Sequence, residues 1–160
     1  MIWLTFGIAA LMAIAPVTAC AAAEIQQGVE GLLGPTWRLV RYGAVTAPKS
    51  VPPGRRGPWG PATLRFGVSQ TSNPPPAGED SLSASDGCNE VFGLSYRTNA
   101  GRLVVTFSKG WGTTLKACPV EHEPQKAAFY AGLRGSERFM IDGKTLTILY
   151  DDGKSALVFE

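Results

Sequence analysis

Apolar and polar residues alternate with a period of two over much of the chain after residue 32. The alternation is clear over residues 37–40, 63–68, 92–96, 102–108 and 145–150, and an apolar run follows at 156–159. This period is typical of β-strands that bury one face. In the run at 92–96, it predicts that Phe92, Leu94 and Tyr96 share one face of a strand.

Short segments between these runs favour hairpin turns. They are residues 99–101, 142–144 and 151–153, and each combines glycine with asparagine or aspartate. These residue types tolerate the positive φ angles that tight hairpins need, so the sheet is predicted to be antiparallel. A total of about eight strands favours a strongly curved or barrel-like sheet.

One segment departs from the period of two. Residues 121–133 have acidic side chains early and a short apolar face, and Arg134 follows. Pro124 is tolerated in the first turn of a helix, and Gly135 is typical of a helix end. The sequence therefore predicts an α+β fold, in which one helix packs on a mostly antiparallel, curved sheet.

Two proline-rich segments, residues 47–61 and 71–79, interrupt the strands. Proline lacks a backbone N–H, so neither segment can form an interior strand, and both are predicted to be loops. Trp59 is the large apolar residue of the first segment. We expect its ring to fold back over the edge of the sheet, with contact to a partner as the alternative.

The amino-terminal segment resembles an export signal. Residues 1–23 carry no charged side chain, and an apolar run is followed by Pro16 and small residues. This order predicts a signal peptide over residues 1–19. Val17-Thr18-Ala19-Cys20 resembles the lipobox of bacterial lipoproteins, in which the cysteine sulfur is lipidated and the preceding peptide is removed. Residues 20–31 then form a tether, and residues 32–160 form the domain.

Two alternatives to lipidation remain open. An ordinary signal peptidase could cut among residues 19–23 and release a soluble secreted or periplasmic protein, or the segment could stay as an uncleaved anchor. Pro16 disfavours the anchor, and the lack of Lys or Arg in residues 1–6 is unusual for any signal. We favour a membrane attachment through Cys20. By analogy with lipoprotein sorting in enterobacteria, Ala21 predicts the outer membrane, facing the periplasm.

Composition narrows the possible partners. The formal net charge is +2 and the pI is near 8.5, which is too mild to predict a nucleic-acid partner. About 140 residues remain after the signal, enough for one domain with a core. We expect a monomer without a cofactor. We also expect no metal site, because no second Cys or His lies at ligand spacing from Cys88 or Cys118.

The chain contains 3 cysteines, an odd number for an exported protein. If Cys20 carries lipid, Cys88 and Cys118 remain as a pair in an oxidising compartment. We predict a disulfide between them, closing a loop of about 30 residues and contributing roughly 3–4 kcal/mol in the chain-entropy model. The alternative is two buried free thiols that lie near each other.

Several motifs together resemble the META (HslJ-like) domain. Trp37-Arg38-Leu39 follows Leu33-Gly34, and Gly87-Cys88-Asn89 precedes Phe92-Gly93 and Tyr96. Thr114 and Cys118 match the domain's Thr-x-x-x-Cys segment, and Glu123 and Phe129 match its helix. The resemblance covers nearly all of residues 32–159, and the Gly-Cys-Asn motif with its second cysteine is its specific part. The chain departs from the family in its longer proline-rich loops and in Lys116-Ala117, where a Met often precedes the second cysteine.

The resemblance implies a fold and a compartment more firmly than an activity. It implies a non-enzymatic exported lipoprotein that serves stress tolerance or envelope maintenance through contact with an envelope protein. The alternative function is a binder of a small apolar ligand within the curved sheet. Candidate residues for that site are Trp37, Phe66, Tyr96 and Phe107, although aromatic residues in a domain of this size are more often core.

The Gly87-Cys88-Asn89 motif favours a structural role over catalysis. Asp86 and Asn89 can hydrogen-bond their own backbone in a turn, and Gly87 permits a positive φ, so we predict a kink that presents Cys88 toward Cys118. A nucleophilic cysteine needs a base, and the single histidine is His122. A histidine on the surface of a helix needs no catalytic role, so we predict no catalytic residues.

Overall fold

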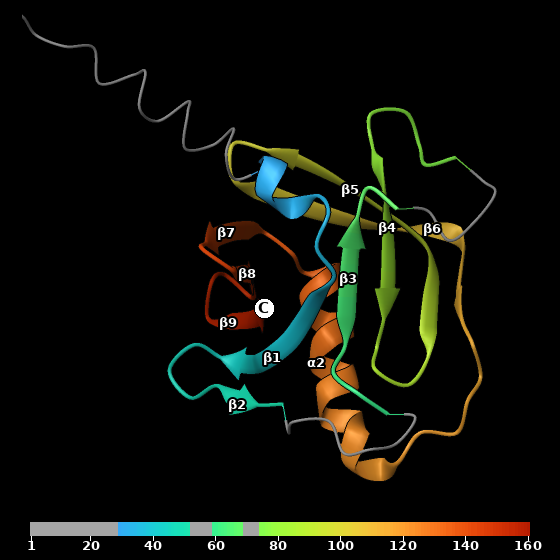
Figure 1. The fold of residues 1–160 in the computed structure, drawn as a ribbon, viewed down its shortest axis with the longest axis vertical. Helices are drawn as coiled ribbons and strands as arrows, with labels where there is room; N and C mark the ends of the chain where they lie inside the picture. The colour runs from blue at the N-terminus through green and yellow to red at the C-terminus, as the bar shows by residue number, and fades with distance from the viewer. Residues whose placement is uncertain (1–28, 52–58, 69–73) are drawn as a thin grey trace, which may run out of the picture.

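The computed structural model describes residues 29–51, 59–68 and 74–160. Within these ranges the chain forms a helical turn at residues 29–32, a 9-stranded antiparallel sheet and one longer helix (Figure 1). The strands are β1 (Trp37–Ala44), β2 (Lys49–Ser50), β3 (Thr63–Phe66), β4 (Asp80–Ser85), β5 (Glu90–Asn99), β6 (Arg102–Thr113), β7 (Arg138–Asp142), β8 (Thr145–Tyr150) and β9 (Ser155–Phe159). The α+β prediction is confirmed.

The sheet closes on itself through its first and last long strands. Neighbours follow the order β2-β1-β3-β4-β5-β6-β7-β8-β9, and β1 also pairs with β9, with Leu39 opposite Phe159. β1 thus pairs with β3 at its start and with β9 along most of its length, while the short β2 lies outside the closed ring. The result is the strongly curved, barrel-like sheet that the strand count predicts.

The closed ring is weakest between β6 and β7. These two strands share a single register pair, Arg102 opposite Arg138. The backbone N–H groups of Leu103 and Phe139 add hydrogen bonds to the carbonyls of Glu137 and Gly101, at 3.2 and 3.0 Å. β6 and β7 share no further register pair, and the helix of residues 123–134 packs against β6.

The helix α2 (Glu123–Arg134) follows a short 3-10 turn, η1 (Val120–His122). Pro124 lies in its first turn, and the Gly135 N–H caps its end by donating to the Ala131 carbonyl at 2.9 Å. α2 packs against β1, β6, β8 and β9, and Figure 1 shows it running along the inside of the curved sheet. Phe129 and Leu133 are completely buried there.

Two details of the strands and the tether differ from prediction. Phe92 does not share a face with Leu94 and Tyr96, because the β5–β6 register shifts between Phe92 and Leu94 and Val91 takes the buried position. β5 forms a bulge against β4, because Phe92 and Gly93 together lie opposite Ser83. Gly93 has a φ of +77°, and this bulge reverses the alternation. Residues 29–31, expected in the tether, are helical, and Leu32 beside them is completely buried.

No helix in the described ranges is long and apolar enough to cross a membrane. The proposed signal peptide at residues 1–19 lies outside those ranges, as do Cys20 and the start of the tether.

Gly132 lets α2 approach the sheet. A β-carbon at this position would lie 2.5 Å from Leu157 Cδ1 and 3.2 Å from Tyr150 Cε1. Leu157 is completely buried, so it has little room to move. The absence of a side chain at Gly132 therefore sets how closely α2 and β9 pack.

We expect Gly132→Ala to lower the free energy of unfolding by about 1–2 kcal/mol. Overpacking a core costs roughly 1–3 kcal/mol, which outweighs the gain of about 1 kcal/mol in helix propensity. Urea denaturation measures the change. The reverse exchange on the exposed side of the helix, Ala131→Gly, should cost about 1 kcal/mol from propensity alone. An increase in stability for Gly132→Ala would contradict the close approach.

Candidate functional site

The turn between β4 and β5 is organised by a buried carboxylate. Asp86 is only 1% exposed. Its Oδ1 accepts hydrogen bonds from the backbone N–H groups of Cys88 and Asn89, at 2.9 and 2.6 Å. These bonds satisfy two backbone donors in a buried turn and offset the cost of burying the carboxyl group. The predicted turn with Asp86 as its acceptor is confirmed.

Asp86 also fastens this turn to α2. Its Oδ2 accepts a hydrogen bond from the Tyr130 hydroxyl at 3.2 Å. Its backbone carbonyl accepts bonds from His122 Nε2 at 2.8 Å and from Gln125 Nε2 at 3.2 Å. Since a carbonyl only accepts, Nε2 of His122 carries the proton. His122 therefore has a structural partner in the turn.

Gly87 is required at the tip of the turn. Its φ is +92°, and a β-carbon there would lie 2.1 Å from the Gly60 carbonyl oxygen and 2.9 Å from His122 Cε1. The Gly60 N–H also donates to the Gly87 carbonyl at 2.9 Å. The turn is thus packed between the end of the first proline-rich loop and the start of α2, with no space for a side chain.

Cys88 and Cys118 form a disulfide, with an S–S distance of 1.99 Å and a sequence separation of 30. It joins the turn to the segment that connects β6 with η1. We name residues 114–120 the disulfide loop. The predicted cysteine pair is present, and the alternative of two free thiols does not describe this structure.

The Asn89 side chain holds the backbone of the disulfide loop. Its Oδ1 accepts bonds from the Thr114 hydroxyl at 2.9 Å and from the Lys116 N–H at 2.8 Å. Its Nδ2 lies 3.0 Å from Cys118 Sγ and 3.4 Å from the Lys116 carbonyl. The side chain was expected to bond its own turn, and the structure corrects this, because it reaches across to the other segment of the disulfide.

Two aliphatic side chains project from this fixed loop. Leu115 is 97% exposed and Val120 is 83% exposed. Neither contributes to the core, although the backbone between them is held by Asn89 and the disulfide. The sequence offered little indication of this, because an apolar residue in a β-rich chain is usually assigned to a strand face.

An aromatic cluster lies where β6 meets α2. The Arg134 guanidinium lies 4.6 Å from the Phe107 ring centroid, 5.1 Å from that of Trp111 and 5.7 Å from that of Tyr130. Burial, together with the negative charge and hydrogen bond of Asp86, raises the pKa of Tyr130 well above its usual value. The Tyr130 hydroxyl therefore stays protonated and donates to Asp86.

The four candidate ligand residues lie in two different parts of the structure. Trp37, Phe66 and Tyr96 belong to the packed core, where the rings of Phe66 and Tyr96 make an edge contact at 4.9 Å. Phe107 is partly buried and lies against Arg134 and Trp111 instead. Binding of an apolar ligand by these residues stays a prediction.

Other predicted features are placed as follows. Trp59 is half-buried. Across the described ranges, no group of three or more His, Cys, Asp or Glu residues is arranged to hold a metal ion. Cys118, the cysteine nearest to His122 in the sequence, is in the disulfide.

The comparisons with known proteins agree with this geometry. The META domain model matches residues 30–160, which include the turn, both cysteines, the disulfide loop and α2. The chain belongs to the META domain family. The motifs that suggested the family are the ones that build the turn and its disulfide.

A solved structure gives a second comparison. The chain is similar to a structure described as the NMR structure of the protein from Burkholderia xenovorans, with a TM-score of 0.59 and 21% sequence identity. The match covers 99% of this chain and 97% of that one. At this identity the likeness shows a shared fold alone. No curated protein matches the chain.

We expect Asp86→Ala to lower the free energy of unfolding by about 3 kcal/mol or more. The change leaves two backbone donors and the Tyr130 hydroxyl without their buried acceptor, and each such group costs roughly 1–3 kcal/mol. Asp86→Asn keeps one acceptor oxygen and should cost less. The exposed Glu121→Ala serves as a control, with a change within about 0.5 kcal/mol. Equal effects of Asp86→Ala and Glu121→Ala in chemical denaturation would refute the role of the carboxylate.

Proposed function

We propose that this META domain protein is an exported lipoprotein, anchored to the cell envelope through a lipid on Cys20, and that it acts by protein contact without catalysis. The observation that carries the proposal is the Cys88–Cys118 disulfide. Disulfides persist in oxidising compartments outside the cytosol, which supports export.

The same disulfide leaves Cys20 as the remaining cysteine of the 3 in the chain. It follows small residues after an apolar run, in the position that a lipobox requires. An acyl chain contributes about 0.8 kcal/mol per buried CH₂ group, so two or three chains give stable attachment. With Ala21 next to the cysteine, we propose the outer membrane, facing the periplasm, as the destination.

The disulfide loop supports a role in protein contact. Its backbone is fixed by the disulfide and by Asn89, while Leu115 and Val120 stand exposed. A loop that is already ordered loses little conformational entropy when it binds. Exposed aliphatic side chains on an ordered loop are suited to enter an apolar pocket on a partner.

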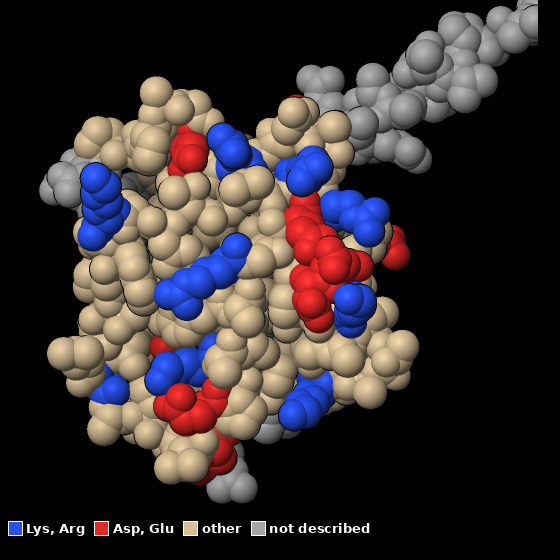
Figure 2. Space-filling model, turned by 180° about the vertical axis from the view of Figure 1, so that it is seen from behind, with Lys and Arg blue, Asp and Glu red and all other residues tan. Residues whose placement is uncertain are grey.

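The position of the disulfide loop favours a partner away from the anchoring membrane. Figure 1 shows the helical turn of residues 29–32 in the upper part of the molecule and the start of α2, which follows the disulfide loop, at the bottom. On the face seen in Figure 2, basic side chains are separated by uncharged surface and several lie beside acidic ones. This pattern suits a protein partner better than a nucleic acid. We propose that such contact supports stress tolerance or envelope maintenance.

Mass spectrometry of the mature amino terminus tests the anchor. We expect cleavage before Cys20 and the mass of a diacylglyceryl or triacyl modification on that residue. Cys20→Ser should abolish both the modification and the membrane fractionation of the protein. An unmodified terminus at Ala22 or Glu24 would show that the protein is released instead.

Site-specific photo-crosslinking in intact cells tests the contact surface. A crosslinker at Leu115 should give a discrete product, and Val120→Asp should weaken it, because a charge enters an apolar contact. A crosslinker at Met140, which is 55% exposed on β7, is the matched control. If both positions give the same products in the same yield, the disulfide loop has no specific partner.

A further inference from the structure

The pairing of β5 with β6 is interrupted in its middle. Phe92 lies opposite Gly112, but the next pair joins Leu94 to Phe107. One residue on β5, Gly93, therefore faces the four residues 108–111 on β6. A mismatch of this size interrupts the ladder and bends β6. It also brings β6 close to Gly93, where a β-carbon would lie 2.7 Å from Trp111 Cα and 2.8 Å from Ser108 Oγ.

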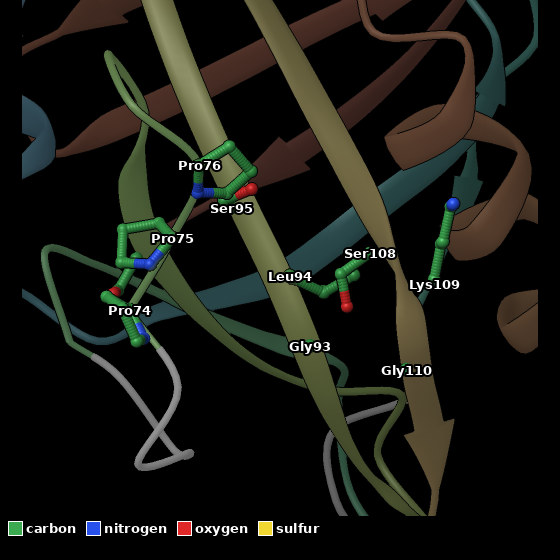
Figure 3. A pocket seen from close by; sticks show the side chains of 10 residues that line it. Pro74, Pro75, Pro76, Gly93, Leu94, Ser95, Ser108, Lys109 and Gly110 are labelled. Carbon is green, nitrogen blue, oxygen red and sulfur yellow. The ribbon is translucent and has the colours of Figure 1, made fainter.

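A cavity of about 300 Å³ lies at this interruption. The segment 74–76, three consecutive prolines, forms one wall, and β5 and β6 form the floor (Figure 3). In this view the side chains of Leu94 and Ser108 lie in the gap between the two strands. The volume is at the lower end of the range for small-molecule sites, roughly 300–1,000 Å³.

The proline wall is fastened to the sheet by Glu79. The carboxylate of Glu79 accepts hydrogen bonds from the Ser95 hydroxyl and, at 3.0 Å, from the Thr106 hydroxyl. The Glu79 N–H donates to the Pro76 carbonyl at 3.0 Å, closing a turn directly after the prolines. Ser95 is buried, so the anchor is protected from solvent. The cavity therefore has a preformed wall.

The lining of the cavity is uncharged where it faces the space. The hydroxyls of Ser81 and Ser108 can each donate and accept hydrogen bonds, while Leu94 and the proline rings supply apolar surface. Lys109 also lines the cavity, but Figure 3 shows its amine pointing away from the three prolines. A cationic ligand would lose hydration without gaining an opposite charge from this lining, and an anionic one would find only the exposed Lys109 amine.

We propose that this cavity binds a small uncharged polyhydroxy ligand of the sugar class. A sugar ring offers hydroxyls on its edge that match serine hydroxyls and C–H groups on its faces that match proline and leucine. Its size suits the space beside Gly110, where a β-carbon would meet no atom within 4 Å. The same ring can occur free or at the end of a glycan. This site is separate from the disulfide loop and does not depend on the proposed anchor.

Saturation-transfer difference NMR on the purified full chain in detergent tests the site. The probes are glucose, N-acetylglucosamine and their β-linked dimers, with glucuronate and glucosamine as charged analogues. We expect transfer to at least one neutral probe and weaker transfer to its charged analogue. Stronger transfer to the dimers than to the single sugars would assign the site to glycan ends.

Substitutions at two glycines separate binding at the cavity from binding elsewhere. A β-carbon at Gly110 or at Gly60 meets no atom within 4 Å, so both positions accept a side chain. Gly110→Leu fills space at the cavity and should reduce affinity by roughly tenfold or more, whereas Gly60→Leu, outside the cavity, should leave it unchanged. Ser108→Ala removes one hydrogen-bonding group and should reduce affinity by about two- to tenfold.

The proposal is overturned by any of three results. They are no transfer to any neutral probe, equal transfer to charged and neutral probes, or equal affinity in Gly110→Leu and Gly60→Leu. Near-ultraviolet circular dichroism confirms that each variant is folded. If Gly110→Leu is not folded, the affinity of Ser108→Ala is compared with that of the unmodified chain, and this comparison decides.

Discussion

The buried carboxylate of Asp86 is the contact on which the rest of the arrangement depends. It orders the turn that positions Cys88, and through Tyr130 it ties the sheet to the helix that fills the barrel. The backbone carbonyl of the same residue holds His122 and Gln125 at the start of α2. A carboxylate is expensive to bury, so its site must supply donors from several directions. Here those donors come from the turn itself and from Tyr130 on α2, 44 residues further along the chain.

The helix and the disulfide compensate for an incomplete ring of strands. β6 and β7 share one register pair, so backbone hydrogen bonds alone hold this seam weakly. α2 packs against β6 on one side of this seam and against β8 and β9 on the other, and buries Phe129 and Leu133. The disulfide joins the segment that leads into α2 to the turn after β4. In the chain-entropy model, closing a loop of 30 residues stabilises the fold by roughly 3–4 kcal/mol. That amount is a large share of the stability of a typical domain.

Much of the fold could be predicted from local sequence patterns. Features that depend on contacts between residues far apart in sequence could not. Alternation located most strands, and the turn at 99–101 shows the expected positive φ angle at Gly101, with a second one at Ala100. Phe92 was assigned to the wrong face because alternation assumes an unbroken ladder, and Gly93 breaks it. The turn at Gly87 was predictable, but the role of Asn89 was not, since its partners lie more than 20 residues away. For the same reason sequence alone could not show the cavity between β5 and β6.

The pairing of β1 with β9 constrains the order in which the chain can fold. Arg38, near the start of the domain, exchanges two backbone hydrogen bonds with Glu160. When the chain emerges amino terminus first, from a ribosome or a translocation channel, β1 therefore cannot complete this pairing until residues 155–160 arrive. During that interval the β9-facing edge of β1 is an open template for other strands. Contacts between sequence-distant strands also slow folding, so this edge of β1 is open to aggregation until the domain has folded.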